Sequence, residues 1–408
     1  MKILFLTQIV PFPPDAGPRV KTWSVLRSLV AQGHFVNLLS FVRPEETSYL
    51  PALEKICNSV YSVAIRRSRL ADVGYMIRSY VTGRPFLVER DDLRPMQELV
   101  NDLVKQDEYD FIHADQLTMV QFALRAAKQA NKKPKVIFDA HNAVWTIVER
   151  MRSNTNWLLK LILRIEAKRV KYYEGELLKR VDHVLVVTDA DRVGLEEAFR
   201  ISKIREDEKA APITVVPIAT DTVNLRPIKR EPTSKNIVTL GTLHYPPNAD
   251  GIRWFLNEVF PLIRQRVPDA TLTIIGKNPP KDFLNYAAHN STTVEVTGYV
   301  PELAPYLQQS ALMVVPVRAG GGMRVRILEA FAYAMPVVTT AVGLEGIHAE
   351  PKRDVLVADT AIDFAECVIE LLNDTRLQEK LSLNGRSLAE KKYDWQKVLS
   401  AMKPVYGS

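Results

Sequence analysis

Apolar residues in the first half of the chain come in short runs that alternate with longer stretches of helical periodicity. The run Lys2–Ile9 is almost continuously apolar, which is typical of a strand buried on both faces of a parallel sheet. A proline-rich loop follows at Pro11–Pro18, and a helix is predicted over Val20–Gln32 with Gly33 as its C-terminal cap. The next strand is predicted at His34–Val42. This opening predicts an α/β sheet with right-handed crossovers.

The same alternation continues along the first half and starts again after a break. The break is Asp221–Ser234, which carries prolines and mixed charges without a period, as a linker does. Further strands before the break are predicted at Phe111–His113, Lys135–Asp139, Val184–Val187 and Ile213–Val216. After the break, strands are predicted at Ile237–Leu240, Ala270–Gly276, Val294–Thr297, Leu312–Val317 and Val337–Thr340, and helices at Gly251–Arg266 and Leu328–Ala334.

Two similar halves of this kind predict an α/β protein with two doubly wound, Rossmann-like domains that face each other across a cleft. We expect a first domain at residues 1–220 and a second at 235–390, with a last helix over about 393–408 that packs back on the first. Ligands of open α/β sheets bind beyond the carboxyl ends of the strands. Residues that directly follow strands are therefore the candidates for the functional site.

Composition narrows the class of protein only slightly. The chain has 408 residues, of which 47 % are hydrophobic and 25 % charged, as in an ordinary globular protein. Its net charge of +7 suits an anionic partner, or is merely the charge of a basic surface. The two cysteines, Cys57 and Cys367, have no metal-binding spacing and exclude a disulfide scaffold. With no apolar run long enough to span a bilayer, we expect a cytoplasmic location.

One stretch, Leu158–Arg180, has a helical pattern with many cations among its leucines and isoleucines. It fits an amphipathic helix lying on an anionic membrane surface, in which case the protein would sit peripherally on the inner face of the membrane. An ordinary surface helix with one buried face is the favoured alternative, because Glu166, Glu174 and Glu176 dilute the positive charge of the stretch. No stripe of basic and aromatic residues of the kind that binds nucleic acid is present.

The strongest candidate for a ligand site is the stretch Val317–Ala330, which follows an apolar strand and leads into a helix. Three consecutive glycines allow a ligand to approach the backbone, and a helix N-terminus favours an anion. Two arginines add fixed charge suited to phosphate, and the acid in the first turn can accept hydrogen bonds from ribose hydroxyls. The residues are Gly320, Gly321, Gly322, Arg324, Arg326 and Glu329, with Met323 between the glycines and the arginines.

A second candidate is the loop after the first strand, where Gly17 is followed by Arg19 and Lys21. This loop can meet a donor phosphate or an acceptor, or is simply a rigid proline-rich turn. Two histidines, His113 and His141, follow strands of the first half, where a histidine can bind a substrate hydroxyl or carry a proton. Either histidine can instead be structural.

Several segments together resemble the family-4 retaining glycosyltransferases. In the second half these are Gly320–Ala330, Pro336–Val338, Gly343–Ile347, Gly241–Gly251, Ile275–Lys277, Gly298–Val300 and Tyr393–Trp395. The first half is similar through Pro13–Pro14, Gly17, Gly33–His34 and Val215–Asp221. The opening proline, glycine and arginine pattern is most similar to bacterial sugar transferases associated with exopolysaccharide loci.

The resemblance implies a GT-B fold and transfer of a sugar, with retention and without a metal or cofactor, from a nucleotide-diphosphate sugar, preferably a UDP-sugar. The acceptor implied is a glycan or a lipid-linked glycan. His141 matches a histidine that contacts the donor sugar, and we assign it a catalytic role together with Arg324. The predicted donor-binding residues are Gly17, Gly241, Thr242, Lys277, Tyr299, Val300, Gly320, Gly321, Gly322, Met323, Arg326 and Glu329. The predicted acceptor-binding residues are Arg19, Lys21 and His113.

The chain departs from the family pattern in three places. Gly321 stands where the family has the first glutamate of its E-x7-E motif, of which Glu329 is the second. Thr242 and Asn248 stand where relatives carry an arginine and a lysine, so we expect Arg324 and Arg326 to supply the missing charge, with Arg324 as the first choice. The third departure is Ile218–Ala219, in place of Asn-Gly. These losses leave open a weak or inactive sugar-nucleotide-binding protein, or a GT-B epimerase.

Overall fold

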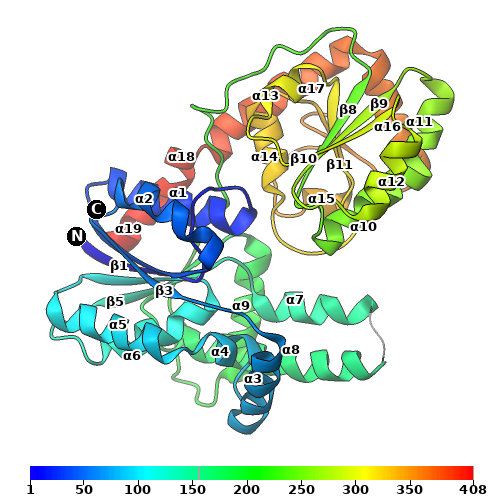
Figure 1. The fold of residues 1–408 in the computed structure, drawn as a ribbon. Helices are drawn as coiled ribbons and strands as arrows, with labels where there is room; N and C mark the ends of the chain where they lie inside the picture. The colour runs from blue at the N-terminus through cyan, green and yellow to red at the C-terminus, as the bar shows by residue number, and fades with distance from the viewer. Residues whose placement is uncertain (155–156, 408) are drawn as a thin grey trace. The chain divides into compact units, whose positions relative to one another are not determined.

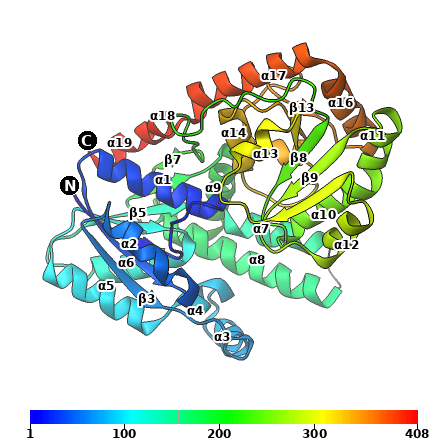
Figure 2. The same ribbon diagram turned by 45° about the horizontal axis from the view of Figure 1, so that its top comes forward.

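A computed structural model describes residues 1–154 and 157–407 and divides the chain into two compact units. The first comprises Met1–Ile218 and the residues from Val398 onward, and the second comprises Ala219–Lys397. Each unit has one parallel sheet with helices on both faces (Figures 1 and 2). The prediction of two doubly wound α/β domains is therefore confirmed.

The first unit contains a seven-stranded sheet in the order β3-β2-β1-β4-β5-β6-β7. Its helices α1 and α2 cover one face, and α5 and α6 cover the other (Figure 1). The strands are β1 (Lys2–Thr7), β2 (Phe35–Val42), β3 (Ser59–Ala64), β4 (Phe111–Asp115), β5 (Lys135–Ala140), β6 (His183–Val186) and β7 (Ile213–Val215). The helices are α1 (Gly17–Ala31), α2 (Leu50–Glu54), α3 (Arg69–Thr82), α4 (Phe86–Asp91), α5 (Arg94–Gln106), α6 (Val120–Ala127), α7 (Val144–Arg150), α8 (Trp157–Leu178) and α9 (Asp189–Ser202).

The second unit repeats the arrangement with six strands in the order β10-β9-β8-β11-β12-β13. Helices α13 and α14 lie on one face of this sheet, and α10, α11 and α12 on the other (Figure 1). The strands are β8 (Asn236–Leu240), β9 (Thr271–Ile275), β10 (Val294–Gly298), β11 (Leu312–Val315), β12 (Val337–Thr339) and β13 (Leu356–Val357). The helices are α10 (Pro246–Trp254), α11 (Phe260–Arg266), α12 (Lys281–His289), α13 (Ala304–Gln308), α14 (Val325–Ala332), α15 (Ala341–Leu344), α16 (Ala361–Asn373) and α17 (Thr375–Leu388).

Several elements differ from the sequence prediction, among them the short strand β13, which was not predicted. The strand β3 was not predicted, since its residues are only partly buried at the edge of the sheet. The helix predicted over Gly251–Arg266 is divided by a π-helical turn at Phe255–Val259, because Pro261 cannot donate a backbone hydrogen bond. The last helix is divided into α18 (Trp395–Leu399), a 3-10 turn and α19 (Lys403–Tyr406), in which Pro404 is the second residue.

The order of the strands determines where a ligand can bind in each unit. In the first sheet β2 lies on one side of β1 and β4 on the other, so the strand order reverses beside β1. In the second sheet it reverses in the same way beside β8, with β9 on one side and β11 on the other. Loops on either side of such a switch point diverge, and the crevice between them is the usual ligand site of doubly wound sheets. The two glycine-containing candidate loops begin at these strands.

Helices α8 and α9 pack at close range around Gly175. A Cβ atom at Gly175 would overlap with the carbonyl oxygen of Ala198, which is a backbone atom and cannot turn aside. In α3, by contrast, a Cβ atom at Gly74 would meet nothing within 4 Å. Helix propensity should therefore decide the effect of alanine at Gly74, whereas steric overlap should decide it at Gly175.

We predict opposite effects for these two glycine-to-alanine substitutions. Gly175→Ala should lower the free energy of unfolding by about 1–3 kcal/mol. Gly74→Ala should raise it by about 0.5–1 kcal/mol, because alanine loses less backbone entropy than glycine in a helix. Urea unfolding followed by circular dichroism measures both, and a stabilised Gly175→Ala variant would show that α8 and α9 do not approach so closely.

Candidate functional site

In the second unit, the glycine-rich loop between β11 and α14 has a backbone that requires glycine. Gly320 and Gly322 have φ values of +99° and +84°, a region that other residues avoid. Met323 is buried and fixes the end of the loop in the core. The loop therefore presents its backbone at the N-terminus of α14, where a helix favours an anion.

Arg326 joins this loop to the one that follows β8. Its Nη2 atom donates a 2.5 Å hydrogen bond to Asn248 Oδ1, and its Nη1 atom donates to the carbonyl oxygen of Leu240. A Cβ atom at Gly241 would overlap with the same Nη1 atom, so any larger residue there would displace the guanidinium from this position. Burial and the neighbouring Arg324 lower the pKa of Arg326 to about 10, which leaves it charged at neutral pH. A fixed cation thus lies directly against Gly241.

Arg324 supports its own loop. Its Nη1 atom donates to the carbonyl oxygens of Gly321 and Gly322, at 2.6 and 2.5 Å. Gly321, where relatives have a carboxylate, therefore contributes a carbonyl oxygen to the binding of this guanidinium. Of the two arginines, Arg324 holds the glycine loop and Arg326 lies against Gly241.

Glu329 lies on α14 one turn beyond Arg326 and is partly buried. Burial raises the pKa of its carboxyl, and the positive charge of Arg326 opposes that shift. Among the residues that the structure describes, no side chain or backbone group donates a hydrogen bond to it. Its oxygens remain available to hydroxyl donors.

The remaining predicted donor residues lie at the carboxyl ends of neighbouring strands. Lys277 follows β9, and its Nζ atom lies 4.5 Å from the centre of the Tyr299 ring, which follows β10. The ring is 59 % exposed, so it offers a flat surface beside a cation. The carbonyl oxygen of Thr242 accepts a 3.1 Å hydrogen bond from the Asn248 side chain. Val300, which is partly buried, follows Tyr299 in the loop after β10. The sheet thus brings these residues to one edge.

In the first unit, the last residue of β4 organises the edge of the sheet. Asp115 is fully buried and accepts hydrogen bonds of 2.9 Å from the hydroxyls of Thr7 and Thr22. Its other oxygen lies 2.8 Å from His141 Nε2, which we assign as the protonated nitrogen. Nδ1 of His141 is then the nitrogen left for a substrate. Sequence analysis missed Asp115, although an acid directly after an apolar strand is the signal that identifies it.

A second buried carboxylate, Asp139, follows the same pattern at the end of β5. Lys21 forms an ion pair with it, and His113 Nε2 lies 3.5 Å from its second oxygen. Burial alone would raise the pKa of Asp139, but the Lys21 ammonium, with the two histidines, holds it well below its usual range. Nδ1 of His113 lies 2.5 Å from the hydroxyl of Tyr406, in the last helix.

This arrangement changes the interpretation of two predicted acceptor residues. Lys21 is 2 % exposed and His113 is fully buried, and both face groups of the protein itself. The cost of burying an unpaired charge explains why the Lys21 ammonium stays with Asp139. The structure therefore places Lys21 and His113 behind the site and not on its surface.

The described residues hold one group whose ligand atoms lie close enough together for a metal ion, namely His113, Asp115 and Asp139. The ammonium of Lys21 already forms an ion pair with Asp139, and Asp115 accepts two hydroxyls. Both carboxylates of the group are thus already bound by side chains of the chain itself.

Gly17 and Arg19 lie at the start of α1. Gly17 is the first residue of the helix, and Pro18 occupies its first turn, where a missing N–H group costs nothing. Arg19 donates to Asp15 at 2.9 Å and to Glu46 at 2.5 Å. Its charge is therefore shared with two carboxylates of the same unit.

The loop that carries His141 is held by two further acids. Ala143 N–H donates to Asp191 at 3.0 Å, and the N–H groups of Val144 and Trp145 donate to Glu174 at 2.7 and 3.1 Å. These are the donors that the start of α7 cannot satisfy within the helix. Glu174 and Asp191 thereby fix the backbone immediately after His141.

Sequence profiles of known families cover both units. The profile described as "Glycosyltransferase Family 4" matches residues 19–223, and the one described as "Glycosyl transferases group 1" matches residues 234–374. The chain belongs to glycosyltransferase family 4. It is thus a glycosyltransferase, as the residues of its second half predicted.

Individual relatives agree with this assignment. An uncharacterised 44.6 kDa protein in the cps region of Klebsiella pneumoniae is 23 % identical over 98 % of each chain. An uncharacterised glycosyltransferase of Methanocaldococcus jannaschii is 29 % identical over 31 % of this chain and 37 % of its own length.

Solved structures share the fold. The crystal structure of Anabaena Alr3699/HepE in complex with UDP has a TM-score of 0.71 at 14 % identity, and each chain is covered over its full length. Sucrose-phosphate synthase from Thermosynechococcus elongatus has a TM-score of 0.70 at 15 % identity, with 100 % of this chain and 98 % of that chain covered. The predicted GT-B fold is confirmed. None of the helices in the described part of this glycosyltransferase has the length and apolarity that a membrane crossing needs.

Glu174 leads to a prediction about pH. Burial raises its pKa to about 8, although two N–H donors oppose the shift. The folded protein therefore keeps a proton that the unfolded chain releases near the ordinary value of 4.5, and the free energy of unfolding should fall as the pH rises from about 4.5 to about 8. Glu174→Gln should remove this part of the pH dependence, as measured by urea unfolding across that range.

Glu196→Gln on α9 is the matched control, because this side chain is only partly buried. Its pH dependence should equal that of the wild-type protein. If Glu174→Gln retains the full wild-type slope, Glu174 is ionised in the folded protein.

Proposed function

We propose that this glycosyltransferase moves a sugar from a UDP-sugar to a glycan or lipid-linked acceptor, with retention of configuration and without a metal or cofactor. The observation that carries the proposal is the position of Arg326, whose guanidinium lies against Gly241 and beside the glycine loop. Both loops begin at the switch point of the second sheet, where a nucleotide is expected. A cation held there matches the charge of a diphosphate.

The leaving nucleoside diphosphate gains negative charge as the bond between the sugar carbon and the phosphate oxygen breaks. Preorganised cations and N–H groups stabilise such charge at no cost of reorganisation. Arg326 and the N-terminus of α14 provide these groups, and Arg324 keeps the glycine loop in shape through Gly321 and Gly322. This division of labour supports transfer without a divalent ion, and it favours Arg326 over Arg324 as the residue that contacts the phosphate.

The rest of the donor has matching partners along the same edge. We infer that Glu329 accepts the ribose hydroxyls and that Tyr299, Lys277 and Val300 surround the base. Complexes of the Anabaena protein with UDP and with UDP-glucose support a uridine donor. Retention follows from the family-4 resemblance, and His141 would contact the donor sugar through Nδ1 while Asp115 holds Nε2.

The acceptor is proposed on more general grounds. The relative in a cps region supports a role in polysaccharide biosynthesis. A lipid-linked glycan would place the enzyme peripherally on the cytoplasmic face of a membrane. Gly17 and Arg19, at the start of α1, are the residues of the first unit that remain as candidates for substrate contact.

Gly321 favours a second candidate function. Without the usual carboxylate, the contact to the donor sugar is weaker, which fits a protein that binds a sugar nucleotide with little or no turnover. Such a protein would bind UDP as tightly as an active enzyme, so turnover and affinity must be measured separately.

Glu329→Gln tests the ribose contact. If Glu329 holds both hydroxyls, the substitution should weaken UDP binding by about 1–3 kcal/mol, the scale of hydrogen bonds to a charged group. Isothermal titration calorimetry with UDP measures this change. Unchanged affinity would refute the assignment.

Arg326→Ala tests the phosphate contact and with it the proposed function. We expect about a 10²–10³-fold loss of turnover, which is typical for one oxyanion donor, and a smaller change in UDP affinity because the charge develops in the transition state. Release of UDP from a UDP-sugar in the presence of an acceptor glycan measures turnover, and calorimetry measures affinity. Arg326→Lys, which keeps the charge, should retain part of the activity.

Arg324→Ala serves as the comparison. It should lower activity less than Arg326→Ala, because Arg324 acts on the loop and not on the phosphate. The reverse order would restore Arg324 as the phosphate contact. Wild-type turnover in both variants would show that neither arginine replaces the cations that relatives carry after Gly241.

A further inference from the structure

Helix α3 presents an apolar stripe to solvent. Leu70, Val73, Ile77 and Val81 recur at spacings of three and four, so they share one face of the helix. Leu70 is 86 % exposed and Val81 is 82 % exposed, whereas Ser79 is the one buried residue of the helix. Amphipathic helices of globular proteins normally bury such a stripe, and this one is turned outward.

The first half of α8 has the same property. Trp157, Leu158, Leu159, Leu161 and Ile165 are all exposed, with Trp157 at 78 %. The second half of α8 is different, since Ala167, Val170, Leu177 and Leu178 are buried. The apolar character noted in the sequence at Leu158–Arg180 is thus divided between a buried half and an exposed half.

The two helices that carry these exposed stretches are in contact within the first unit. The guanidinium of Arg169, on α8, lies 4.4 Å from the centre of the Tyr80 ring, on α3. Glu166 on α8 accepts a 2.6 Å hydrogen bond from the N–H group of Phe86, at the start of α4. Figures 1 and 2 both show α3 beside α8.

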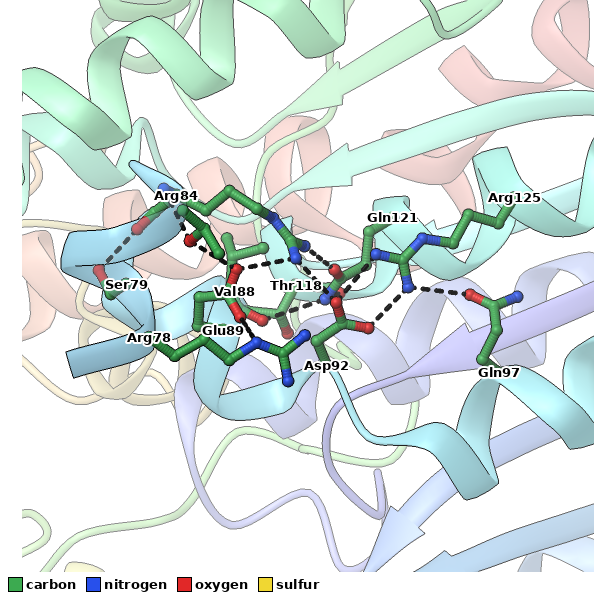
Figure 3. A network of polar contacts seen from close by, with 11 residues as sticks. Arg78, Ser79, Arg84, Val88, Glu89, Asp92, Gln97, Thr118, Gln121 and Arg125 are labelled. Atoms are coloured by element: carbon green, nitrogen blue, oxygen red, sulfur yellow. Dashed lines mark hydrogen bonds and ion pairs between the residues drawn. The ribbon is translucent and has the colours of Figure 1, made fainter. Parts of the chain in front are cut away.

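Helix α3 is held firmly at its base, so its exposed stripe is not that of a loosely attached segment. Arg78 forms a 2.8 Å ion pair with the buried Glu89, and Ser79 donates to the carbonyl oxygen of Arg84 at 2.6 Å. Arg84 in turn forms ion pairs with Glu89 and Asp92, and Arg125 forms a second ion pair with Asp92 (Figure 3). This network fixes the C-terminal end of α3 to α4 and α6.

The charges beside the two apolar stripes indicate which kind of partner would bind there. Arg66, Arg69, Lys160, Arg164 and Lys168 are exposed, and within residues 1–154 and 157–407 none of them forms an ion pair. The acids of the same stretches are Asp72, which is partly buried, and Glu166, which is turned toward Phe86. Exposed apolar stripes flanked by unpaired cations match the boundary between acyl chains and anionic headgroups.

A second copy of the chain fits this surface poorly. In a two-fold dimer the same patch faces itself, which would bring the five cations opposite one another. We infer that α3 and the first half of α8 form one docking surface for an anionic lipid bilayer. The inference rests on the lipid-linked acceptor proposed above, and it adds α3 to the helix that the sequence indicated.

The experiment is flotation of the full-length protein with vesicles of phosphatidylcholine alone or with about 30 % phosphatidylglycerol. The wild-type protein should bind the anionic vesicles and release them as salt is raised. Leu70→Glu/Ile77→Glu on α3 should lower the partition coefficient about tenfold or more. Lys160→Gln/Arg164→Gln on α8 should lower it by a similar factor.

Matched controls change equally exposed residues elsewhere in the first unit. Ile201→Glu on α9 replaces a side chain that is 57 % exposed, and Lys105→Gln/Lys128→Gln removes two exposed cations. Both variants should bind anionic vesicles as the wild-type protein does. Wild-type binding by the α3 variant would overturn the inference, as would equal binding to neutral and anionic vesicles. A dimer in analytical ultracentrifugation that Ile77→Glu dissociates would overturn it in favour of a second copy.

Flotation requires no turnover, so it separates this inference from the proposed function. UDP affinity should be unchanged in every surface variant, since none of them lies in the second unit. A protein that fails to release UDP from UDP-sugars but floats with anionic vesicles would refute the proposed function and leave the docking surface in place.

Discussion

Every strand in each sheet runs parallel to its neighbours, and this single constraint decides where chemistry can occur in the molecule. Parallel strands bring all their carboxyl ends to one edge, and the reversal of strand order beside β1 and beside β8 separates two loops at that edge. Asp115 and Asp139 end neighbouring strands of the first sheet, and the loops of Gly241 and Gly320 follow neighbouring strands of the second. Residues far apart in sequence become neighbours for this reason alone.

This arrangement buries charged side chains at the sheet edges, which is unfavourable. Partners from other segments of the chain stabilise them. Asp139 pairs with Lys21 through one of its oxygens, and Asp115 accepts two threonine hydroxyls, so each carboxylate has a partner from another segment at the sheet edge. Arg326 is treated in the same way, with Leu240 and Asn248 as acceptors. Asn248 therefore has a structural role in this chain, since its side-chain oxygen accepts a hydrogen bond from Arg326.

The exposed stripe of α3 is the opposite case, since here apolar side chains lie in water and not in the core. Single apolar side chains on a protein surface are common and need no explanation. A contiguous stripe of them marks an interaction site. The ion pairs beneath α3 hold the helix rigidly while its outer face stays bare. A surface built in this way is preorganised, which reduces the entropy lost on docking.

The sequence alone determined the elements, the two-domain α/β class and the family, because these depend on local periodicity and on short motifs. The run that became β11 is apolar over its whole length and those of β1 and β8 are mostly apolar, and the glycines after β11 predicted the loop that follows it. The same local information missed β3, the division of the last helix and Asp115. These depend on partial burial at a sheet edge, on single prolines and on one acid among many.

Only the tertiary structure decided which charges pair with other groups of the protein. Lys21 and His113 were predicted to contact a substrate, yet each is satisfied by a partner 118 or more residues away, namely Asp139 and Tyr406. The sequence analysis preferred Arg324 to Arg326, but in the structure Arg324 binds its own loop and Arg326 reaches Gly241. The physical reason is that a charge is stabilised by whatever lies within a few ångströms of it, and the sequence does not contain those distances.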